Sequence, residues 1–385
     1  MEHLFPRPIF TDFGPNRLLP AAVGPTTGRA DASRPGRLRK QVRAQIPRRQ
    51  PGVYGMLNVR GELIYVGKAK CLRTRLLSYF RAKSRGAKAG RIVKQTRGLV
   101  WEAATSEFAA LLRELELIQR WRPRFNVHGQ PHRRRRVYVC IGRPPAPYVY
   151  LSAKMPASGS LCYGPVPAGE TAREAVRRIN DAFRLRDCPQ AQEMVFADQR
   201  ELFPLDLAAG CIRHEINACL GPCAAAVTRR AYMVRVRAAR AFLEGADLSL
   251  LSDLQREMQA ASDALAFERA AALRDRHYSL AWLHRFLDRL RQARERAPWV
   301  YPVRGVDGSE TWYLIRGGHV VEARPAPKDS AERMAVAARL RSLGCAAKAA
   351  SPVAPDEVDG VLLVVAWFYR HPKEAACGLD TRSVA

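Results

Sequence analysis

The sequence predicts an α+β protein with several parts in series. Two short β-prone segments between residues 51 and 67, separated by a glycine turn, indicate an antiparallel hairpin. Apolar residues at helical spacing follow this hairpin, and they recur in a longer helical pair between residues 246 and 285. A further hairpin pattern begins at residue 312. We therefore expect a short antiparallel sheet flanked by helices, a cysteine-rich α/β segment, a helical hairpin and a small C-terminal α+β unit.

Composition shifts give the expected boundaries of these parts. Residues 1–49 are rich in Pro, Gly and Arg with little periodicity, and we expect them to form a disordered basic arm. Four structured parts should follow: the small sheet domain at 50–128, a linker with the cysteine-rich domain at 129–245, the helical hairpin at 246–285 and the C-terminal unit at 298–385.

The charge of the chain favours a polyanionic partner. Its 385 residues include 64 Lys and Arg against 36 Asp and Glu, which gives a formal net charge of +28. Nucleic acid is the usual partner of such an excess, although a genome that favours arginine codons would also raise it. No apolar run is long enough to cross a bilayer, so we expect no membrane partner. Nine cysteines without an export signal favour a reducing, cytoplasmic location and thiol or metal chemistry over disulfides.

The first hairpin and its helix concentrate polar groups that could act on a phosphate. An apolar segment from Val53 to Val59, a polar turn and a second apolar segment from Leu63 to Val66 form the two strands, and the helix carries Leu72, Leu76 and Leu77. The candidate reactive side chains gather where the second strand meets the helix: Tyr54, Tyr65, Lys68, Arg75 and Tyr79.

A helix is predicted from Ser106 to Trp121. Ser106 is a plausible N-cap, Glu107 lies in the first turn, and Pro123 ends the helix. Phe108, Leu111, Leu112, Leu115 and Ile118 form its apolar stripe. Glu114 projects from the edge of that stripe, where a carboxylate can be partly buried and still face a cleft; taken alone, it would be read as a surface residue.

These two stretches resemble the GIY-YIG nuclease module in the version found in the bacterial UvrC/Cho family. The resemblance rests on Gly52-Val53-Tyr54, Tyr65-Val66-Gly67, the following Lys68, the spaced Arg75 and Tyr79, and the text SEFAALLRELELIQRWRPRFNV. It implies that Glu114 binds one Mg²⁺ or Mn²⁺ ion and that Asn126 completes the catalytic site. Arg75 would clamp the phosphate, Tyr79 would orient it, and Tyr54 or Tyr65 would accept a proton from water with help from the charge of Lys68.

Further basic residues near the same helix are candidates for DNA contact. The alternative is a solvated helix and loop, but their position beside the expected site favours phosphate contact. The candidates are Arg73, Arg81, Lys83, Arg91 and Lys94.

Four cysteines form a second constellation, Cys188, Cys211, Cys219 and Cys223. Thiolates suit iron–sulfur clusters and zinc alike, His214 could replace one thiolate in a zinc site, and buried free cysteines are the remaining alternative. The resemblance to UvrC implies a 4Fe-4S cluster with zinc as the alternative, although the gap between Cys188 and Cys211 is longer than that family's norm. The other cysteines, Cys71, Cys140, Cys162, Cys345 and Cys377, are read as ordinary.

The helical pair resembles the UVR motif, through which UvrC pairs with UvrB. The text FERAAALRD matches its core, and a short hairpin buries too little apolar area to be stable alone. The implied partner is a UvrB-like protein or a second copy of the hairpin, with packing inside this chain as the alternative. The expected contact residues are Phe267, Glu268, Ala271, Leu273 and Arg274.

Taken together, the resemblance implies a structure- or lesion-directed DNA endonuclease of nucleotide excision repair. It would make a single metal-dependent incision in double-stranded DNA that carries a lesion or distortion, after recruitment by a UvrB-like protein. The RNase H-like nuclease and helix-hairpin-helix repeats that follow the UVR motif in that family are not expected here. Two alternatives remain: a non-catalytic DNA-binding adaptor, and a GIY-YIG nuclease of a mobile element or defence system.

Overall fold

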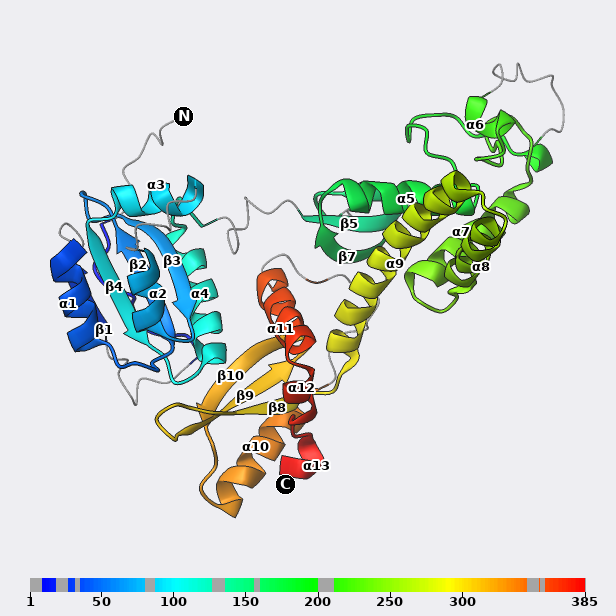
Figure 1. Ribbon diagram of the computed structural model, residues 1–385. Helices are drawn as coiled ribbons and strands as arrows, with labels where there is room; N and C mark the ends of the chain where they lie inside the picture. The colour runs from blue at the N-terminus through cyan, green and yellow to red at the C-terminus, as the bar shows by residue number, and fades with distance from the viewer. Residues whose placement is uncertain are drawn as a thin grey trace. The chain divides into compact units, whose positions relative to one another are not determined.

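The computed structural model in Figure 1 describes residues 9–18, 27–31, 35–79, 87–126, 136–155, 160–199, 211–344, 353 and 357–384. The chain folds into two compact units. Unit 1 consists of Met1–Arg134, Arg296–Ala346 and Asp359–Ala385, and unit 2 of Arg135–Glu295 and Ala347–Val358. None of the helices among the described residues is long and apolar enough to cross a membrane.

Unit 1 begins with a four-stranded antiparallel sheet in the order β1-β4-β2-β3. The predicted hairpin is confirmed as β2 (Gly52–Leu57) and β3 (Leu63–Ala69), and β4 (Gly98–Ala103) lies on the other side of β2. Helices α2 (Leu72–Tyr79) and α3 (Ala87–Gln95) pack on one face, and α4 (Glu107–Trp121) packs on the other. The sheet is therefore buried on both faces, which fits its apolar strands.

The expectation of a disordered N-terminal arm is wrong for much of that segment. Strand β1 (Thr27–Asp31) pairs with β4 along the edge of the sheet, and helix α1 (Pro35–Gln45) buries Val42. Gly28 makes the pairing possible, because a Cβ there would lie 2.2 Å from the indole of Trp101. The high Pro, Gly and Arg content of residues 1–49 led us to miss strand β1 and the short apolar face of helix α1.

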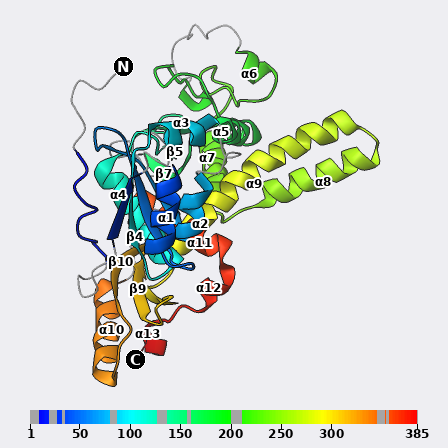
Figure 2. The same cartoon turned by 60° about the vertical axis from the view of Figure 1, so that its left-hand side comes forward.

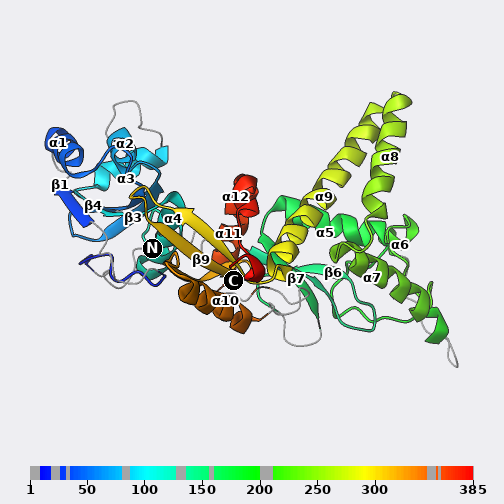
Figure 3. The same ribbon diagram turned by 90° about the horizontal axis from the view of Figure 1, so that it is seen from below.

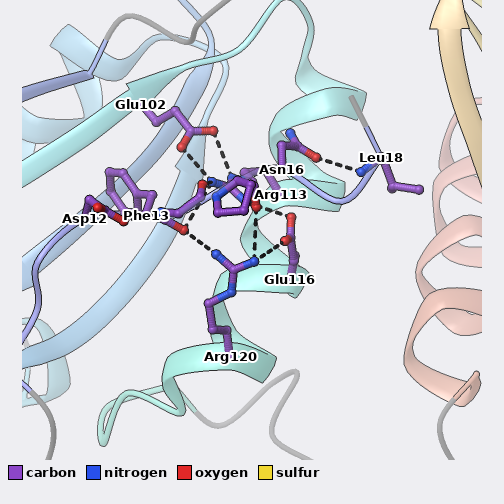
Figure 4. A network of polar contacts seen from close by, with 10 residues as sticks. Asp12, Phe13, Asn16, Leu18, Glu102, Arg113, Glu116 and Arg120 are labelled. Carbon is purple, nitrogen blue, oxygen red and sulfur yellow. Dashed lines mark hydrogen bonds and ion pairs between the residues drawn. The ribbon is translucent and has the colours of Figure 1, made fainter. Parts of the chain in front are cut away.

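Residues 9–18 are held against α4 by two arginines, as Figure 4 shows. Arg113 is almost fully buried and forms a two-pronged ion pair with Glu102 of β4, with both N···O distances 2.9 Å. Its guanidinium also donates to the carbonyl of Gly14, while Arg120 donates to the carbonyl of Phe13. These bonds give the backbone carbonyls of Phe13 and Gly14 hydrogen-bond donors, and so fix a segment that has little regular secondary structure.

The C-terminal part of unit 1 is a second small sheet. Its strands are β8 (Trp299–Arg304), β9 (Glu310–Arg316) and β10 (His319–Pro325), in the order β10-β9-β8. Helices α10 (Ser330–Leu343) and α13 (Thr381–Val384) pack on one face. The other face meets α11 (Val358–Arg370) and the first turns of α4, where Phe108 and Leu111 join its core. A short helix, α12 (Pro372–Ala376), links α11 to α13.

Unit 2 combines a three-stranded sheet with a long helical hairpin. Strands β5 (Arg136–Ile141), β6 (Val149–Ser152) and β7 (Leu161–Pro167) pair in the order β6-β5-β7, and α5 (Glu170–Ala182) covers them. The short α6 (Ile212–Glu215) and the longer α7 (Arg229–Leu243) follow. The predicted hairpin is confirmed as α8 (Ser249–Asp263) and α9 (Phe267–Glu295), which lie side by side in Figures 2 and 3.

Two cysteines that the sequence analysis treats as ordinary form a disulfide in unit 2. Cys140 on β5 and Cys162 on β7 are directly opposite in the strand register, with Cα atoms 4.2 Å apart. Both side chains are buried. The expectation that disulfides are absent is therefore wrong for this pair, because strand pairing joins two cysteines that no local spacing connects.

The shared core of α4 and the C-terminal sheet generates a stability prediction. Phe108 is 1% exposed and its ring lies within 5.3 Å, centroid to centroid, of the rings of Tyr301, Tyr313 and Trp367. Phe108→Ala should lower the free energy of unfolding by about 3–5 kcal/mol, because it leaves a cavity among three aromatic rings. Urea denaturation followed by tryptophan fluorescence measures the change.

The exposed Met334→Ala on α10 is the matched control and should change stability by less than about 0.5 kcal/mol. A loss below about 1 kcal/mol for Phe108→Ala would show that α4 and the C-terminal sheet do not share a core.

Candidate active site

Two phenol groups and one guanidinium meet between β2 and α2. The hydroxyls of Tyr54 and Tyr79 are 2.9 Å apart. Arg75 donates from Nε to the Tyr54 hydroxyl at 3.3 Å and from a terminal nitrogen to the Tyr79 hydroxyl at 3.1 Å. Arg75 itself is exposed, so its remaining donors can reach an incoming anion. The structure thus brings together three of the predicted catalytic residues.

A glycine of the sequence motif explains how the Tyr54 ring fits. Tyr54 and Gly67 are opposite each other in the β2–β3 register, and the Tyr54 ring crosses directly over Gly67. A Cβ at position 67 would lie 2.6 Å from the phenol carbon and oxygen of Tyr54. Only glycine leaves room for the Tyr54 ring at this position.

The phenols of Tyr54 and Tyr65 are held in the neutral form. The Tyr65 ring lies 6.1 Å from that of Tyr54, and the Tyr54 ring 6.0 Å from that of Tyr79. Burial raises the pKa of Tyr54 and of Tyr65 well above the usual value for phenols, and the neighbouring phenols add to the shift. In the protein alone, neither residue has the lowered pKa that the predicted role of general base requires.

Glu114 lies on α4 at the edge of the same group. Burial raises the pKa of its carboxyl to about 7, against the opposing charges of Lys68 and Arg75 and a hydrogen bond from the Lys68 backbone N–H. Near neutral pH this carboxylate is therefore half protonated. The carboxylate of Glu114 also contributes to the raised pKa of Tyr65, which places the two side chains within electrostatic range of each other.

Lys68 is held by an acid that the sequence analysis did not assign to the site. Its ammonium lies 2.9 Å from Oε1 of Glu107, and the ammonium of Lys70 lies 2.8 Å from Oε2. Burial alone would raise the pKa of Glu107, but hydrogen bonds from Lys70 and Lys68 outweigh it and lower the pKa. The sequence did indicate that Glu107 lies in the first turn of α4, because it follows the N-cap Ser106, whose side chain accepts from the Ala109 N–H at 3.1 Å. It did not indicate the ion pair with Lys68.

Asn126 is hydrogen-bonded to the backbone of β3, and its expected role in the catalytic site stays a prediction. Its Oδ1 accepts from the backbone N–H of Val66 at 2.8 Å, and its Nδ2 donates to the carbonyl of Val66 at 2.7 Å. The side chain is buried, so both polar ends are committed to the free edge of β3. These two hydrogen bonds tie the chain after α4 to the strand carrying Tyr65 and Lys68.

The residues expected to contact DNA are only partly described. Arg91 and Lys94 are exposed on α3, and Arg73 is half-buried on α2. Arg81 and Lys83 lie outside the described residues. Their contact with DNA stays a prediction.

The described residues hold no group of three or more His, Cys, Asp or Glu side chains placed to bind a metal ion. A cation at Glu114 would therefore have at most two such side chains among the described residues, with phosphate and water oxygens as its other ligands. Such a donor set suits Mg²⁺, which retains several waters and accepts one or two carboxylates. The partly buried, half-protonated Glu114 fits this role, because a cation would stabilise its charge.

The four clustered cysteines come close but are not arranged as a metal site. Cys219 is buried, Cys188 and Cys223 are half-buried, and Cys211 is exposed. Burial raises the pKa of Cys223, and the neighbouring thiols Cys188 and Cys211 raise it further. The backbone N–H of Gly221 donates to the sulfur of Cys219 at 3.4 Å. The predicted cluster or zinc ion gains no support from this geometry.

The UVR-like hairpin exposes a different set of apolar residues from the one expected. Leu273 is buried in the core between the hairpin helices, 4% exposed, so it is not available to a partner in this conformation. Phe267 is 64% exposed, and Leu265, which the sequence analysis missed, is 71% exposed beside it. Glu268 and Arg274 are exposed, and Ala271 is half-buried.

Three family models match successive parts of the chain. Residues 50–127 match the UvrC-like GIY-YIG domain, residues 137–242 the UvrC/Cho excinuclease middle domain, and residues 249–276 the UvrB/uvrC motif. Each of these three parts is similar to a part of UvrC proteins. Residues 50–127 therefore carry a UvrC-like GIY-YIG domain, and residues 298–385 lie outside all three matches.

Proteins named UvrABC system protein C are similar to the same part of the chain. The one from Desulforudis audaxviator is 36% identical over 226 residues, which cover 59% of this chain and 35% of that protein. The one from Pseudomonas entomophila is 34% identical over 244 residues, which cover 62% of this chain and 37% of that protein. The chain thus spans little more than a third of the length of these UvrC relatives.

A solved structure is similar to the first domain. It is the GIY-YIG N-terminal endonuclease domain of UvrC from Thermotoga maritima, bound to magnesium as its catalytic divalent cation. The identity is 35%, and the match covers 23% of this chain and 98% of that one with a TM-score of 0.20.

The raised pKa of Glu114 generates a prediction for metal binding. A proton and a cation compete for this carboxylate, so the dissociation constant for Mn²⁺ should fall about tenfold from pH 5 to pH 6 and level off above pH 7. Electron paramagnetic resonance of free Mn²⁺ measures it. Glu114→Gln should remove the binding and its pH dependence, and a dissociation constant independent of pH would contradict the assignment.

Proposed function

We propose that this protein is a metal-dependent DNA endonuclease of nucleotide excision repair that makes one incision near a lesion or distortion. The observation that carries the proposal is the convergence of the Tyr54, Arg75 and Tyr79 cluster with the half-protonated Glu114. Phosphodiester hydrolysis needs neutralised phosphate charge, an oriented nucleophile and a stabilised leaving oxygen. These groups can supply each of these needs.

Arg75 binds the scissile phosphate. Its Nε and one terminal nitrogen rest on the two phenol hydroxyls in the free protein, so the guanidinium is already oriented. Tyr79 donates its hydroxyl proton to a second phosphate oxygen, and Lys68, fixed by Glu107, adds positive charge beside the site. The orientation is set before DNA arrives, which reduces the entropy lost on binding.

Glu114 holds the cation, which when bound supplies Lewis-acid polarisation of the phosphate and lowers the pKa of nearby water. Tyr54 and Tyr65 hold and orient the attacking water through their neutral hydroxyls. The raised pKa of both phenols keeps them protonated, so either one would accept the proton of water only after it had released its own proton to solvent, which the positive charge of a bound cation would favour.

A non-catalytic adaptor is the main alternative. It would use the same basic surface to bind DNA and a partner without cutting. The completeness of the polar cluster argues against it, because a binding module has no need for a carboxylate kept at a pKa of about 7 by burial. A nuclease of a mobile element or defence system shares the same site, and only partner binding separates it from the repair assignment.

The hairpin of α8 and α9 is proposed to recruit a UvrB-like protein. Its tip exposes two large apolar side chains, Leu265 and Phe267. Such a pair is a typical anchor for a protein partner. A 4Fe-4S cluster or zinc at Cys188, Cys211, Cys219 and Cys223 and the cytoplasmic location both stay predictions.

Removal of Glu114 or Arg75 tests the enzyme assignment. Glu114→Gln and Arg75→Ala should each reduce nicking of lesion-containing duplex by about 10²-fold or more, because Arg75 neutralises phosphate charge in the transition state and Glu114 holds the cation that does the same. Duplex affinity should change by less than about threefold for Glu114→Gln, because Glu114 is proposed to act in the transition state and not in the initial binding of DNA. Gel assays of nicking with Mg²⁺ and fluorescence anisotropy measure the two quantities.

Arg60→Ala, at an exposed turn of the same domain, removes the same charge as Arg75→Ala and should leave nicking unchanged. Full activity in Glu114→Gln would exclude the proposed site, and a wild-type protein that binds DNA without nicking it would favour the adaptor.

The hairpin tip is tested by the double variant Leu265→Ser with Phe267→Ser. It should weaken binding to purified UvrB by about tenfold or more, because both apolar anchors are lost. Tyr278→Ser, on α9 and 60% exposed but away from the tip, is the control. Isothermal titration calorimetry decides the outcome; equal affinity of the tip variant and the wild-type protein would exclude this contact.

A further inference from the structure

All the charged residues of helix α7 in unit 2 are basic. It carries five arginines and no acidic residue between Arg229 and Leu243. Among the described residues, carboxylates contact only its two ends. Asp198 accepts the backbone N–H of Arg229, and Glu244 forms an ion pair with Arg240 at 2.9 Å. The arginines between these ends form no ion pair with a described residue.

Helix α5 of the same unit provides an internal comparison. It is also rich in arginine, but Arg173 pairs with Glu170, and Arg177 and Arg178 both pair with Glu174. A codon bias toward arginine would act on both helices alike. Of these two helices, only α7 has arginines without an acidic partner among the described residues, so composition alone does not explain the difference.

The arginines of α7 project from the helix face that faces solvent. Tyr232, Val236, Ala239 and Leu243 are buried on the opposite face. Arg230 and Arg237 are exposed and two turns apart, about 10 Å along the axis. Arg229 and Arg235 are exposed at the two borders of this face. We call Arg229, Arg230, Arg235 and Arg237 the α7 arginine face.

We infer that the α7 arginine face binds the phosphate backbone of duplex DNA. This inference rests on the proposed function, because it gives the substrate of the GIY-YIG domain a second contact in unit 2. Arg230 and Arg237 lie together on this face with Arg229 and Arg235 at its borders, and none of the four forms an ion pair with a described residue. These guanidiniums complement a polyanion, and counterion release would drive their association. The face places phosphates without reading bases, as most protein–DNA contacts do.

The composition of the face favours duplex over single-stranded DNA. Proteins that bind single strands present aromatic rings on which bases stack. The two aromatic residues of α7, Tyr232 and Phe242, are 0% and 1% exposed, and the exposed apolar residue on the face is Val234. Without a stacking platform, the face matches the higher charge density of the duplex.

A neighbouring cavity was the other candidate contact in unit 2. It has a volume of about 380 Å³ and lies between β7, the end of α7 and α9. Arg240, Arg291 and Arg294 line it, but so do Glu244 and Glu295. Its charges nearly balance, so the inference is confined to the exposed face.

Two charge-matched double variants test the inference. Arg230→Ala with Arg237→Ala should weaken binding of a duplex of about 30 base pairs by about tenfold or more at about 0.1 M salt, and should lower the slope of log affinity against log salt by about two. Arg173→Ala with Arg177→Ala on α5 removes the same charge and should leave both quantities unchanged. Fluorescence anisotropy over a salt series measures them, with thermal melts to confirm folding.

Further arms separate the remaining explanations. Arg230→Lys with Arg237→Lys keeps the charge and should restore most of the affinity, which excludes a folding defect. Equal losses in the α7 and α5 alanine variants would reduce the effect to net charge, and a loss confined to single-stranded DNA would exclude the duplex; either result overturns the inference. If the wild-type protein failed to nick DNA while Arg230→Ala with Arg237→Ala still lost affinity, the proposed function would be contradicted and this inference would be supported.

Discussion

The burial of one carboxylate is the constraint on which the active site depends. Glu114 sits on a helix packed across the sheet, and the apolar surroundings that hold the helix also remove water from its side chain. Desolvation disfavours the charged form and keeps the pKa near 7, despite two nearby cations. A cation bound at this carboxylate would offset the desolvation cost of its charge. The burial that raises the pKa therefore also favours metal binding.

Helix α4 connects this site to the rest of unit 1. Its first turn fixes Lys68 through Glu107, its middle carries Glu114 and the buried Arg113, and its apolar residue Phe108 enters the core of the C-terminal sheet. A change in the packing of α4 would therefore move the carboxylate and the lysine together. The C-terminal sheet lies outside the UvrC matches, yet it shares a core with the helix that carries the proposed metal ligand.

Much of the nuclease site was predictable from the sequence because its determinants are local. The pairing of Tyr54 with Gly67 follows from strand register, and Arg75 and Tyr79 are one turn apart on the next helix. The remaining features depend on long-range contacts. No local pattern indicates that Asn126 binds both polar groups of Val66, that Arg113 anchors residues 9–18, or that Cys140 meets Cys162 across the strands.

The helical hairpin of α8 and α9 is a second case in which the sequence predicted the elements but not their contacts. Helical periodicity predicted two amphipathic helices but could not say which apolar residues face each other and which face solvent, so Leu273 was assigned to a partner and Leu265 was missed. On α7 the charge pattern was visible in the sequence, but its meaning came only from seeing which arginines have acidic neighbours in space.

The most direct measurement of the central claim is a carbon-13 nuclear magnetic resonance titration of the Glu114 carboxyl group, assigned by comparison with Glu114→Gln. Our account predicts a midpoint near pH 7 in the free protein and an ionised carboxylate throughout the same range when Mg²⁺ is added. An ordinary midpoint near 4, unchanged by Mg²⁺, would contradict it.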